Sequence, residues 1–239
     1  MHLVRFLVVT LVIMQISVLF TTIYLHRALT HRGLELKSAA RAAMHLELTL
    51  FTGIVPREWV AVHRKHHHFS DRAGDPHSPY LLGLWHVLFG NYFYYRKEIR
   101  NPETIRKYTP DYMPDLVDRL RIGHYGMYGG LAIFVLIFGI AWGALAWVFH
   151  IVGYIFLNSM INSLCHMVGY RNYENLATNL RWVAMVTCGE GLHNNHHQYP
   201  SSARFAVRAR EFDPAWPVIR LLQFLGQARV KTDALARAA

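Results

Sequence analysis

Nine of the sixteen histidines of this 239-residue chain lie in three short segments and at one further position. The segments are "HRALTH" (26–31), "HRKHH" (63–67) and "HNNHH" (193–197), and the further histidine ends "NSLCH" (162–166). Neutral imidazole is a common ligand of iron, copper, nickel and zinc. The sequence therefore offers nine histidines and one asparagine as candidate metal ligands: His26, His31, His63, His66, His67, Asn162, His166, His193, His196 and His197.

The spacing of these residues indicates which of them share a helix face. The second and third segments place histidines at i, i+3 and i+4, which puts three imidazoles on one face of an α-helix. Asn162 and His166 also share a face, whereas His26 and His31, five apart, must straddle a helix end or serve different ions. Because one zinc ion takes four ligands, ten candidates predict two metals of about five or six ligands each.

Each segment alone has a plainer interpretation as a solvated cationic patch, a membrane-interface pair or a surface loop. Together they favour metal ligation, because all three meet the same predicted membrane face. The other histidines are interpreted as packed or surface residues, and a supporting role at the metals is only weakly indicated for one of them, His77. The rest of this set is His2, His45, His68, His86, His124 and His150.

Apolar runs predict about three membrane-spanning helices. Residues 3–25 are long enough to cross a bilayer, which takes about 20 residues, and too long for the core of a signal peptide. No Asp, Glu, Lys or Arg stands between residues 121 and 171. That length fits two spans, 127–146 and 148–167, with a tight hairpin near residues 139–143. Residues 46–62 contain "PRE" and are expected to form an interfacial or buried helix.

The expected fold is a single domain, residues 1–239, of an all-α integral membrane protein with a helical cap built from 26–121 and 168–239. Of 25 Lys and Arg, only Arg5 falls on the side opposite the cap, so the positive-inside rule makes the cap cytoplasmic. The charge of +10 suits a lipid surface or a phosphorylated ligand, and no nucleic-acid partner is expected. Cys165 and Cys188 are expected to be reduced, buried thiols.

The chain resembles the membrane fatty acyl desaturases, most closely the stearoyl-CoA (delta-9) type of the bacterial branch. The matching stretches are "HRALTH", "EWVAVHRKHHHFSDRAGDPHSPY", "NSLCHMVGYRNYENLATN" and "GEGLHNNHHQYP". The resemblance implies two non-haem iron ions held by the nine histidines, with Asn162 contacting one iron through water. It also implies an enzyme that uses O2 and two electrons to insert a cis double bond, at delta-9, into a long-chain saturated acyl chain.

The same resemblance implies the partners and the location. The acyl chain is carried on coenzyme A, acyl carrier protein or a phospholipid of the membrane. The electron donor is a separate ferredoxin-like or cytochrome b5-like protein with its reductase, since the chain has no haem-binding His-Pro-Gly segment. The expected location is the bacterial inner membrane, with the active site on the cytoplasmic face. Only one helix precedes the first histidine segment, so the N-terminus is expected outside.

Charged residues near the clusters have expected supporting roles. Among four acidic candidates (Glu58, Asp71, Asp75 and Glu190), Asp75 and Glu190 are favoured as carboxylates that orient metal-bound imidazoles. A set of cations is expected at the surface that meets the substrate head group or the donor, although positive-inside bias explains it equally well: Arg64, Lys65, Arg96, Lys97 and Arg100.

Two alternatives remain open from the sequence. The same scaffold supports an acyl-chain hydroxylase, acetylenase or oxidative decarboxylase, which the sequence separates poorly from a desaturase. A histidine-rich membrane metal transporter or sensor would place polar ligands at mid-membrane depth, whereas the clusters here lie at or beyond the predicted span ends.

Overall fold

The computed structural model describes residues 2–233 and is mostly helical. The elements of the first half are α1 (His2–Phe20), η1 (Thr21–Thr30), β1 (Leu34–Leu36), α2 (Ser38–Thr52), α3 (Pro56–Phe69), α4 (Pro79–Leu82), α5 (Leu84–Ile99), α6 (Pro102–Tyr108) and α7 (Leu116–Arg119). Those of the second half are η2 (Gly123–Gly126), α8 (Met127–Phe138), α9 (Ile140–Met167), α10 (Arg181–Val186), α11 (His193–Gln198), α12 (Ala215–Phe224) and β2 (Ala228–Val230).

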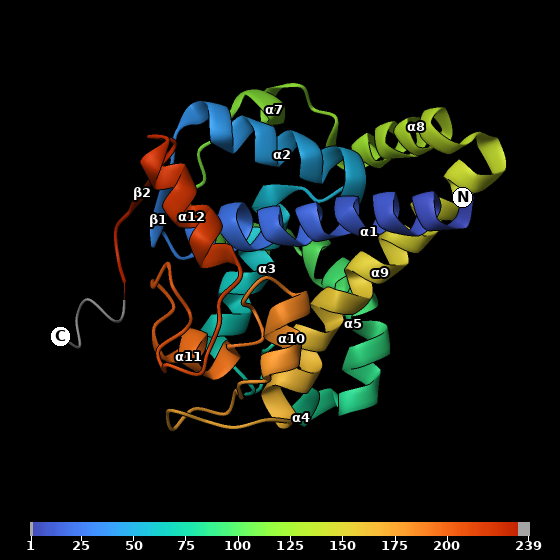
Figure 1. The fold of residues 1–239 in the computed structure, drawn as a ribbon. Coiled ribbons are helices and arrows are strands. Elements are labelled where there is room, and N and C mark those ends of the chain that lie inside the picture. The colour runs from blue at the N-terminus through green and yellow to red at the C-terminus, as the bar shows by residue number, and fades with distance from the viewer. Residues whose placement is uncertain (1, 234–239) are drawn as a thin grey trace.

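Two long helices, α1 with its continuation η1 and α9, form the framework against which the other helices pack. Helix α9 packs against α1, α5 and α8, and η1 continues α1 into contact with α3 (Figure 1). The largest apolar core lies where α1 and η1 meet α2, α9 and α12. The C-terminal ends of η1 and α9 therefore come close to α3 and α11, the helices that hold the other histidines.

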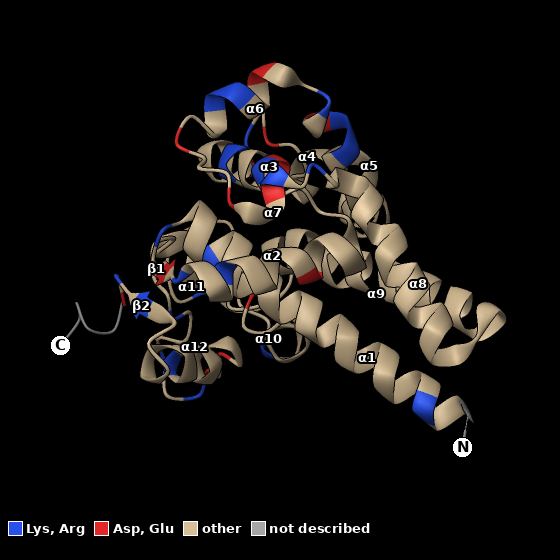
Figure 2. Cartoon of the chain, turned by 90° about the horizontal axis from the view of Figure 1, so that it is seen from above, with Lys and Arg blue, Asp and Glu red and all other residues tan. Residues whose placement is uncertain are grey.

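Within the described residues, two helices are long and apolar enough to cross a membrane, Leu3–Thr30 and Ile140–Met167. A third apolar helical segment, Gly123–Phe138, is shorter. Figure 2 shows that α8 and α9 carry no coloured charge and that charged residues gather around the other elements. Two of the three predicted spans thus correspond to long apolar helices, and the third stays a prediction.

The break between the second and third predicted spans lies earlier than the predicted boundary at residue 147. Helix α9 runs without interruption through that position, and the chain reverses at Gly139, whose φ of 80° is open to glycine. The hairpin then closes tightly, because a side chain at Gly143 would stand 2.5 Å from the Val135 Cα. The prediction of a turn near residues 139–143 is confirmed, and the predicted boundary at residue 147 is wrong, because that residue lies inside α9. That the two helices span a membrane stays a prediction.

The segment 46–62, predicted as one interfacial or buried helix, is two helices. Helix α2 ends at Gly53, which has φ 65° and donates its N–H to the Thr49 carbonyl. Pro56 then begins α3, where its missing N–H costs no helical hydrogen bond. Because the chain breaks between the two helices, α3 places its three candidate ligands independently of α2.

The turn that carries the first two histidines is a π-helix rather than an α-helix. In η1 the N–H of His31 donates to the carbonyl of His26, five residues back, at 3.1 Å. At 3.6 residues per α-helical turn, positions five apart stand about 140° apart, but π-helical bonds bring them onto one side. His31 also follows the last helical residue, so the prediction that the pair straddles a helix end is confirmed.

Smaller elements close the structure around these helices. Strands β1 and β2 form a two-stranded antiparallel ribbon with Leu34 opposite Val230, so the expectation of an all-α fold misses one short ribbon. Residues 101–120 form two short helices, α6 and α7, within a polar loop. Asn101 caps α6, and Asp115 and Asp118 form a capping box on α7.

The α8–α9 contact gives a test of the fold. Gly143→Ala should destabilise the protein by about 1–3 kcal/mol, because the new Cβ meets the backbone of α8, which cannot move as a side chain can. The matched control is Gly153→Ala on the same helix, whose Cβ would meet only the flexible Met14 side chain. Thermal unfolding in detergent measures both, and equal stability of the two variants would contradict this packing.

Candidate metal centre

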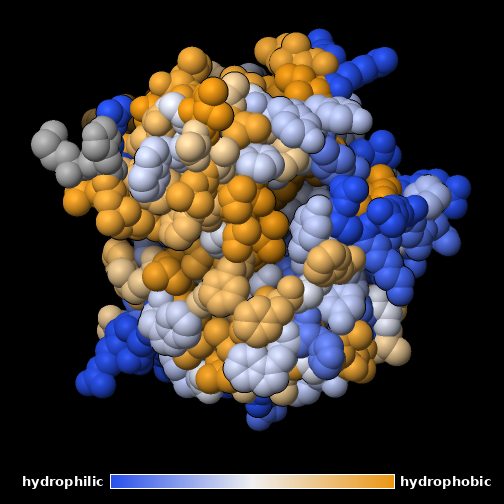
Figure 3. Space-filling model, turned by 90° about the vertical axis from the view of Figure 1, so that its right-hand side faces the viewer, coloured by the Kyte–Doolittle hydropathy of each residue, from blue (hydrophilic) through white to orange (hydrophobic). Residues whose placement is uncertain are grey.

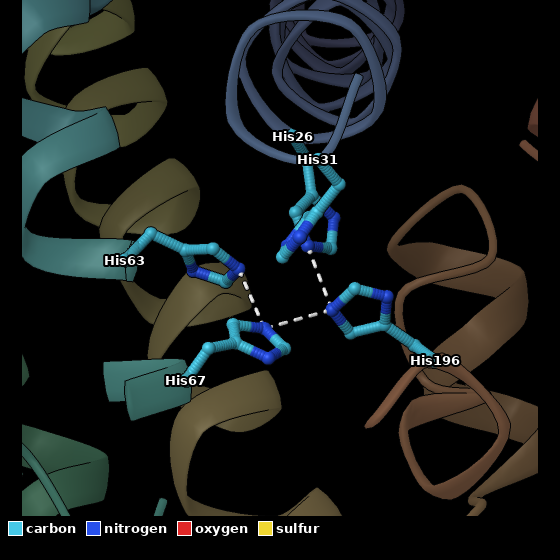
Figure 4. A group of neighbouring side chains, drawn as sticks. All are labelled: His26, His31, His63, His67 and His196. Carbon is cyan, nitrogen blue, oxygen red and sulfur yellow. Dashed lines mark hydrogen bonds between the residues drawn. The ribbon is translucent and has the colours of Figure 1, made fainter. Parts of the chain in front are cut away.

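All nine predicted histidine ligands come together, in two groups. The five-histidine group takes two rings from η1 and its end, two from α3 and one from α11 (Figure 4). One ring nitrogen of each member lies within 4.8 Å of the others. Three Nε2–Nε2 distances define its centre: 3.0 Å for His26–His196, 2.9 Å for His67–His196 and 3.1 Å for His63–His67. The remaining member is His31.

The four-histidine group lies next to the first. It takes His66 from α3, His166 from the end of α9 and two rings from α11, His193 and His197, again within 4.8 Å of one another. The Nε2 atoms of His193 and His166 are 3.0 Å apart, and those of His197 and His193 are 3.1 Å apart. Helices α3 and α11 therefore each contribute histidines to both groups. His63 and His67 of α3 lie in the five-histidine group and His66 in the other, whereas α11 contributes His196 to the first and His193 and His197 to the second.

Carboxylates fix the outer nitrogens of three of these rings. The Nδ1 atoms of His26, His66 and His166 face Glu190 at 2.6 Å, Asp75 at 2.9 Å and Asp71 at 2.7 Å. A ring that donates Nδ1–H to a carboxylate turns a bare lone pair at Nε2 toward the centre. Lone pairs about 3 Å apart repel each other, and a cation between them removes that repulsion. The donor set therefore fits metal ions in both groups.

The histidines are held in the neutral form that metal ligation requires. Burial, followed by the charge that neighbouring imidazoles would carry, lowers the pKa of six of them well below the usual value. The carboxylates keep their charge, because the facing histidines lower the pKa of Asp71, Asp75 and Glu190 against the effect of burial. The six histidines are His31, His63, His67, His193, His196 and His197.

A buried ion pair supports the Glu190 contact. Arg27, next to His26 and fully buried, makes two hydrogen bonds to Asp213, at 2.8 and 2.9 Å. Its Nε donates to the Thr22 hydroxyl, which in turn donates to Glu190. The carboxylate that orients His26 is thus tied through two side chains to the segment before α12.

The two aspartates belong to one folded loop after α3. Asp75 accepts the backbone N–H groups of Asp71 and His77, at 2.8 and 3.0 Å, as well as the His66 ring. Asp71 has φ 63°, a left-handed conformation uncommon outside glycine, and accepts the Ser78 hydroxyl. Asp75 and Glu190 are the two carboxylates favoured from the sequence, and Asp71, from the same "SDRAGDPH" segment as Asp75, has the same role toward His166.

A cavity of about 540 Å³ borders the five-histidine group. His26, His63 and Glu190 form part of its wall, and the Trp59 ring stacks on His63 with centroids 4.8 Å apart. Asn162 lines the same cavity one helical turn before His166. His77 also lines it, buried and with neither ring nitrogen hydrogen-bonded. Most other wall residues are aliphatic or aromatic, including Ile54, Val62, Met127, Ile151, Tyr154, Ile155 and Ile161.

The predicted surface cations divide into three sorts. Arg64 and Lys65 are engaged internally, Arg64 with Asp111 and Lys65 with Glu98 at 2.7 Å. Arg96 lines the cavity, near the ring of His124. Lys97 and Arg100 are exposed on the last turn of α5 and just after it. Of the five, Arg96 is therefore the one placed to meet a ligand in the cavity.

Other predictions meet the structure less closely. Glu58 contacts His124 at 3.1 Å rather than a ligand histidine. His68 is exposed, as predicted, and the free thiols of Cys165 and Cys188 are buried, as predicted. Side chains of α5 in the cavity wall (Asn91, Tyr92 and Tyr95) were missed, because only their i, i+4 spacing signals a shared face.

Comparison with known proteins gives matches over most of the chain. The family model for fatty acid desaturases matches residues 2–225. The chain is 34% identical over 222 residues to an acyl-CoA 5-desaturase of Anemone leveillei, covering 87% of this chain and 65% of that relative. It is 33% identical over 212 residues to an sn-1 stearoyl-lipid 9-desaturase of Anabaena variabilis, covering 87% of this chain and 76% of that relative. These matches confirm the resemblance inferred from the histidine segments.

The metal content of the protein tests the grouping. The purified protein should bind about two metal ions per chain, one in each group. His196→Ala removes the ring shared by two of the closest contacts in the five-histidine group and should lower the content to about one. His68→Ala is the matched control, because His68 is exposed and outside both groups. Plasma mass spectrometry measures the content, and an unchanged value in His196→Ala would refute the assignment.

Acidification should destabilise the metal-free protein. Six histidines have a pKa in the folded state below their ordinary value, so the unfolded chain binds more protons below about pH 6.5. Their contribution to stability is present above that pH and is lost as the pH falls. Thermal unfolding should therefore occur at least a few degrees lower at about pH 5.5 than at about pH 7.5. A transition that does not move would contradict neutral, buried imidazoles.

Proposed function

The chain belongs to the fatty acid desaturase family, and we propose that it inserts a cis double bond at the delta-9 position of a long-chain saturated acyl chain. The family and its curated relatives establish the reaction class, an oxidoreductase that acts on acyl chains. One observation carries the proposal for this chain: nine buried or half-buried histidines meet in two groups, and one group borders an apolar cavity through His26 and His63.

The residues present suit two non-haem iron ions, which we assign to the two groups. Neutral imidazole nitrogen is a good iron ligand, and the four-histidine group has Asn162 nearby on α9, which we assign to contact its iron through water. Bound iron would supply the redox chemistry by which O2 removes one hydrogen from each of two adjacent methylenes. Acid–base groups cannot break these C–H bonds, because the hydrogens are not acidic. Glu190, Asp71 and Asp75 hold the rings in the orientation that directs Nε2 inward.

The cavity supplies position rather than reactivity. A saturated chain has no functional group by which one methylene is told from the next, so the walls must select it by length and bend. Trp59, stacked on His63, and the hydrogen-bonded pair of Thr21 and Tyr154 are wall residues in fixed orientation.

The overall reaction balances with an external donor. The saturated chain, O2, two electrons and two protons give the unsaturated chain and two molecules of water. We assign the electrons to a separate ferredoxin-like or cytochrome b5-like protein with its reductase. The names of the relatives include both acyl-CoA and lipid-bound substrates, so members of this family act on both carriers.

The membrane arrangement is proposed on charge. We place the α1–η1 helix, the α8–α9 hairpin and hence three spans in the bacterial inner membrane, with residues 26–121 and 168–239 as a cytoplasmic cap. The support is the absence of Asp, Glu, Lys and Arg between residues 121 and 171 and the single cation, Arg5, near the start of α1. The histidine groups at the ends of η1 and α9 would then lie at the cytoplasmic surface.

Product analysis in cells that express the protein tests the function. Gas chromatography with mass spectrometry of total acyl chains, after derivatisation at double bonds, should reveal a new cis-monoene at one position. His63→Ala should lose at least about 100-fold of that product, because it removes a ring from the group at the cavity. His68→Ala should retain it.

Other products would assign a different reaction to the same fold. Hydroxylated chains, acetylenic chains or terminal alkenes would replace desaturation by hydroxylation, acetylene formation or decarboxylation. An unchanged acyl profile in cells that load the protein with iron and supply the donor would refute acyl-chain oxidation.

A further inference from the structure

One side of the cavity wall is polar and lacks hydrogen-bond partners within residues 2–233. Asn91 and His77 are buried, at 8 and 4% exposed. The Asn91 side-chain oxygen, both ring nitrogens of His77 and the hydroxyl of Tyr95, one turn after Asn91 on α5, have no partner among these residues. All three side chains line the cavity. Buried polar groups are nearly always hydrogen-bonded, so the occupant of this side of the cavity must supply polar atoms.

The inner end of this polar side lies at the four-histidine group. The ring of His77 packs against that of His66, with centroids 4.8 Å apart. Asn162 lines the same cavity one turn of α9 before His166. Helix α5 begins beside this end of α9, because the hydroxyl of Tyr80, shortly before α5, donates to the His166 carbonyl. The polar side of the cavity therefore starts next to four of the candidate ligands.

The outer end of the polar side reaches charged groups at the surface. Along α5, Asn91, Tyr95 and Arg96 lead away from the four-histidine group, and all three line the cavity. Arg96 lies 3.4 Å from the ring of His124, a side chain that is 41% exposed and contacts Glu58 at 3.1 Å. Figure 3, seen from the α8–α9 side, shows a broad apolar surface with hydrophilic side chains gathered along one side. Bulk water therefore has access at the charged end rather than through the apolar face.

The opposite side of the cavity is apolar and leads to the five-histidine group. It includes Ile54 and the Trp59 ring stacked on His63. A saturated chain fits this side, but against Asn91 and His77 it would leave buried polar atoms unpaired, which is costly. Water both donates and accepts, so it suits the acceptor oxygen of Asn91 as well as the donor and acceptor nitrogens of a neutral His77 ring.

We propose that the polar side of the cavity holds a chain of water molecules between the four-histidine group and the charged end, positioned by His77, Asn91 and Tyr95. The chain delivers the two protons that the reaction takes up and removes the two water molecules that it forms, while the acyl chain occupies the apolar side. The protons pass between water molecules, so no side chain of the path changes its protonation state. The inference rests on the proposed function and adds the route of its protons and product water.

A double-mutant cycle on the metal-free protein tests whether His77 and Asn91 share bound water. His77→Phe and Asn91→Leu each remove partners of the water chain, so the shift in unfolding temperature of the double variant should differ from the sum of the single shifts by at least about 2 °C. Ile151→Leu, at an apolar wall residue, is the control, and its shift should add to that of Asn91→Leu. Additive shifts for the His77 and Asn91 variants would overturn the shared water.

The solvent isotope effect gives the functional readout. Iron-loaded protein receives ferredoxin, its reductase, NADPH and O2, with acyl chains offered as palmitoyl-CoA and as dipalmitoyl phosphatidylglycerol. His77→Phe and Asn91→Leu should lower kcat by at least about fivefold and raise the ratio of kcat in H2O to kcat in D2O, with KM for the acyl substrate unchanged. His77→Gln keeps a donor and an acceptor and should restore most of kcat. His86→Phe, the same change at an exposed position of α5, should have no effect.

The outcomes separate the water path from the function on which it rests. An unchanged isotope ratio, or a raised KM with unchanged kcat, would overturn the path and make His77 and Asn91 part of the substrate wall. No unsaturated product from the unaltered protein would refute the proposed function, whereas the thermal cycle, which needs neither metal nor turnover, still decides the water chain.

Discussion

The structure is organised around a repulsion. Nine imidazoles turn their inner nitrogens toward two centres, at distances near 3 Å, inside the protein. They can stand so close only while neutral, and burial keeps them neutral. Their outer nitrogens need separate partners, which the carboxylates Glu190, Asp71 and Asp75 supply for one ring each. No local segment of chain could hold this arrangement. It draws on four elements far apart in sequence, η1, α3, α9 and α11, each of which must be fixed by contacts elsewhere in the fold.

Those contacts also set the character of the cavity. The long helices α1 and α9 that deliver histidines at their ends form much of the apolar framework, so the centre and the chain-binding space share walls. Trp59 and His63 belong to both. The buried pair of Arg27 and Asp213 ties the first histidine turn to the C-terminal part of the chain. Substitutions that change the length of the cavity must therefore fall at residues of α9 or η1 that do not also position a ligand histidine.

Much of this could be predicted where the signal is local. The i, i+3, i+4 spacing of His63, His66 and His67 and the turn at Gly139 depend on a few neighbouring residues. Three features depended on distant ones. The left-handed backbone at Asp71 is held by side-chain contacts with His166 and Ser78, which the local sequence does not reveal. Arg64 is drawn inward by Asp111, which lies in a loop far along the chain. The continuity of α9 past residue 147 reflects packing against α1 and α5, which apolar composition alone does not reveal.

The π-helical turn of η1 has a consequence for how this protein can change. It accommodates one residue more than an α-helix of the same rise would, and that surplus brings His26 and His31 to one centre. Removing a single residue between them would restore α-helical spacing and rotate everything on one side of the cut by about 100°. Either the two rings would separate, or the apolar face of α1 would turn away from α9. The segment can accept single substitutions one at a time. A single insertion or deletion, by contrast, would disrupt either the five-histidine group or the packing of α1 on α9 in one step.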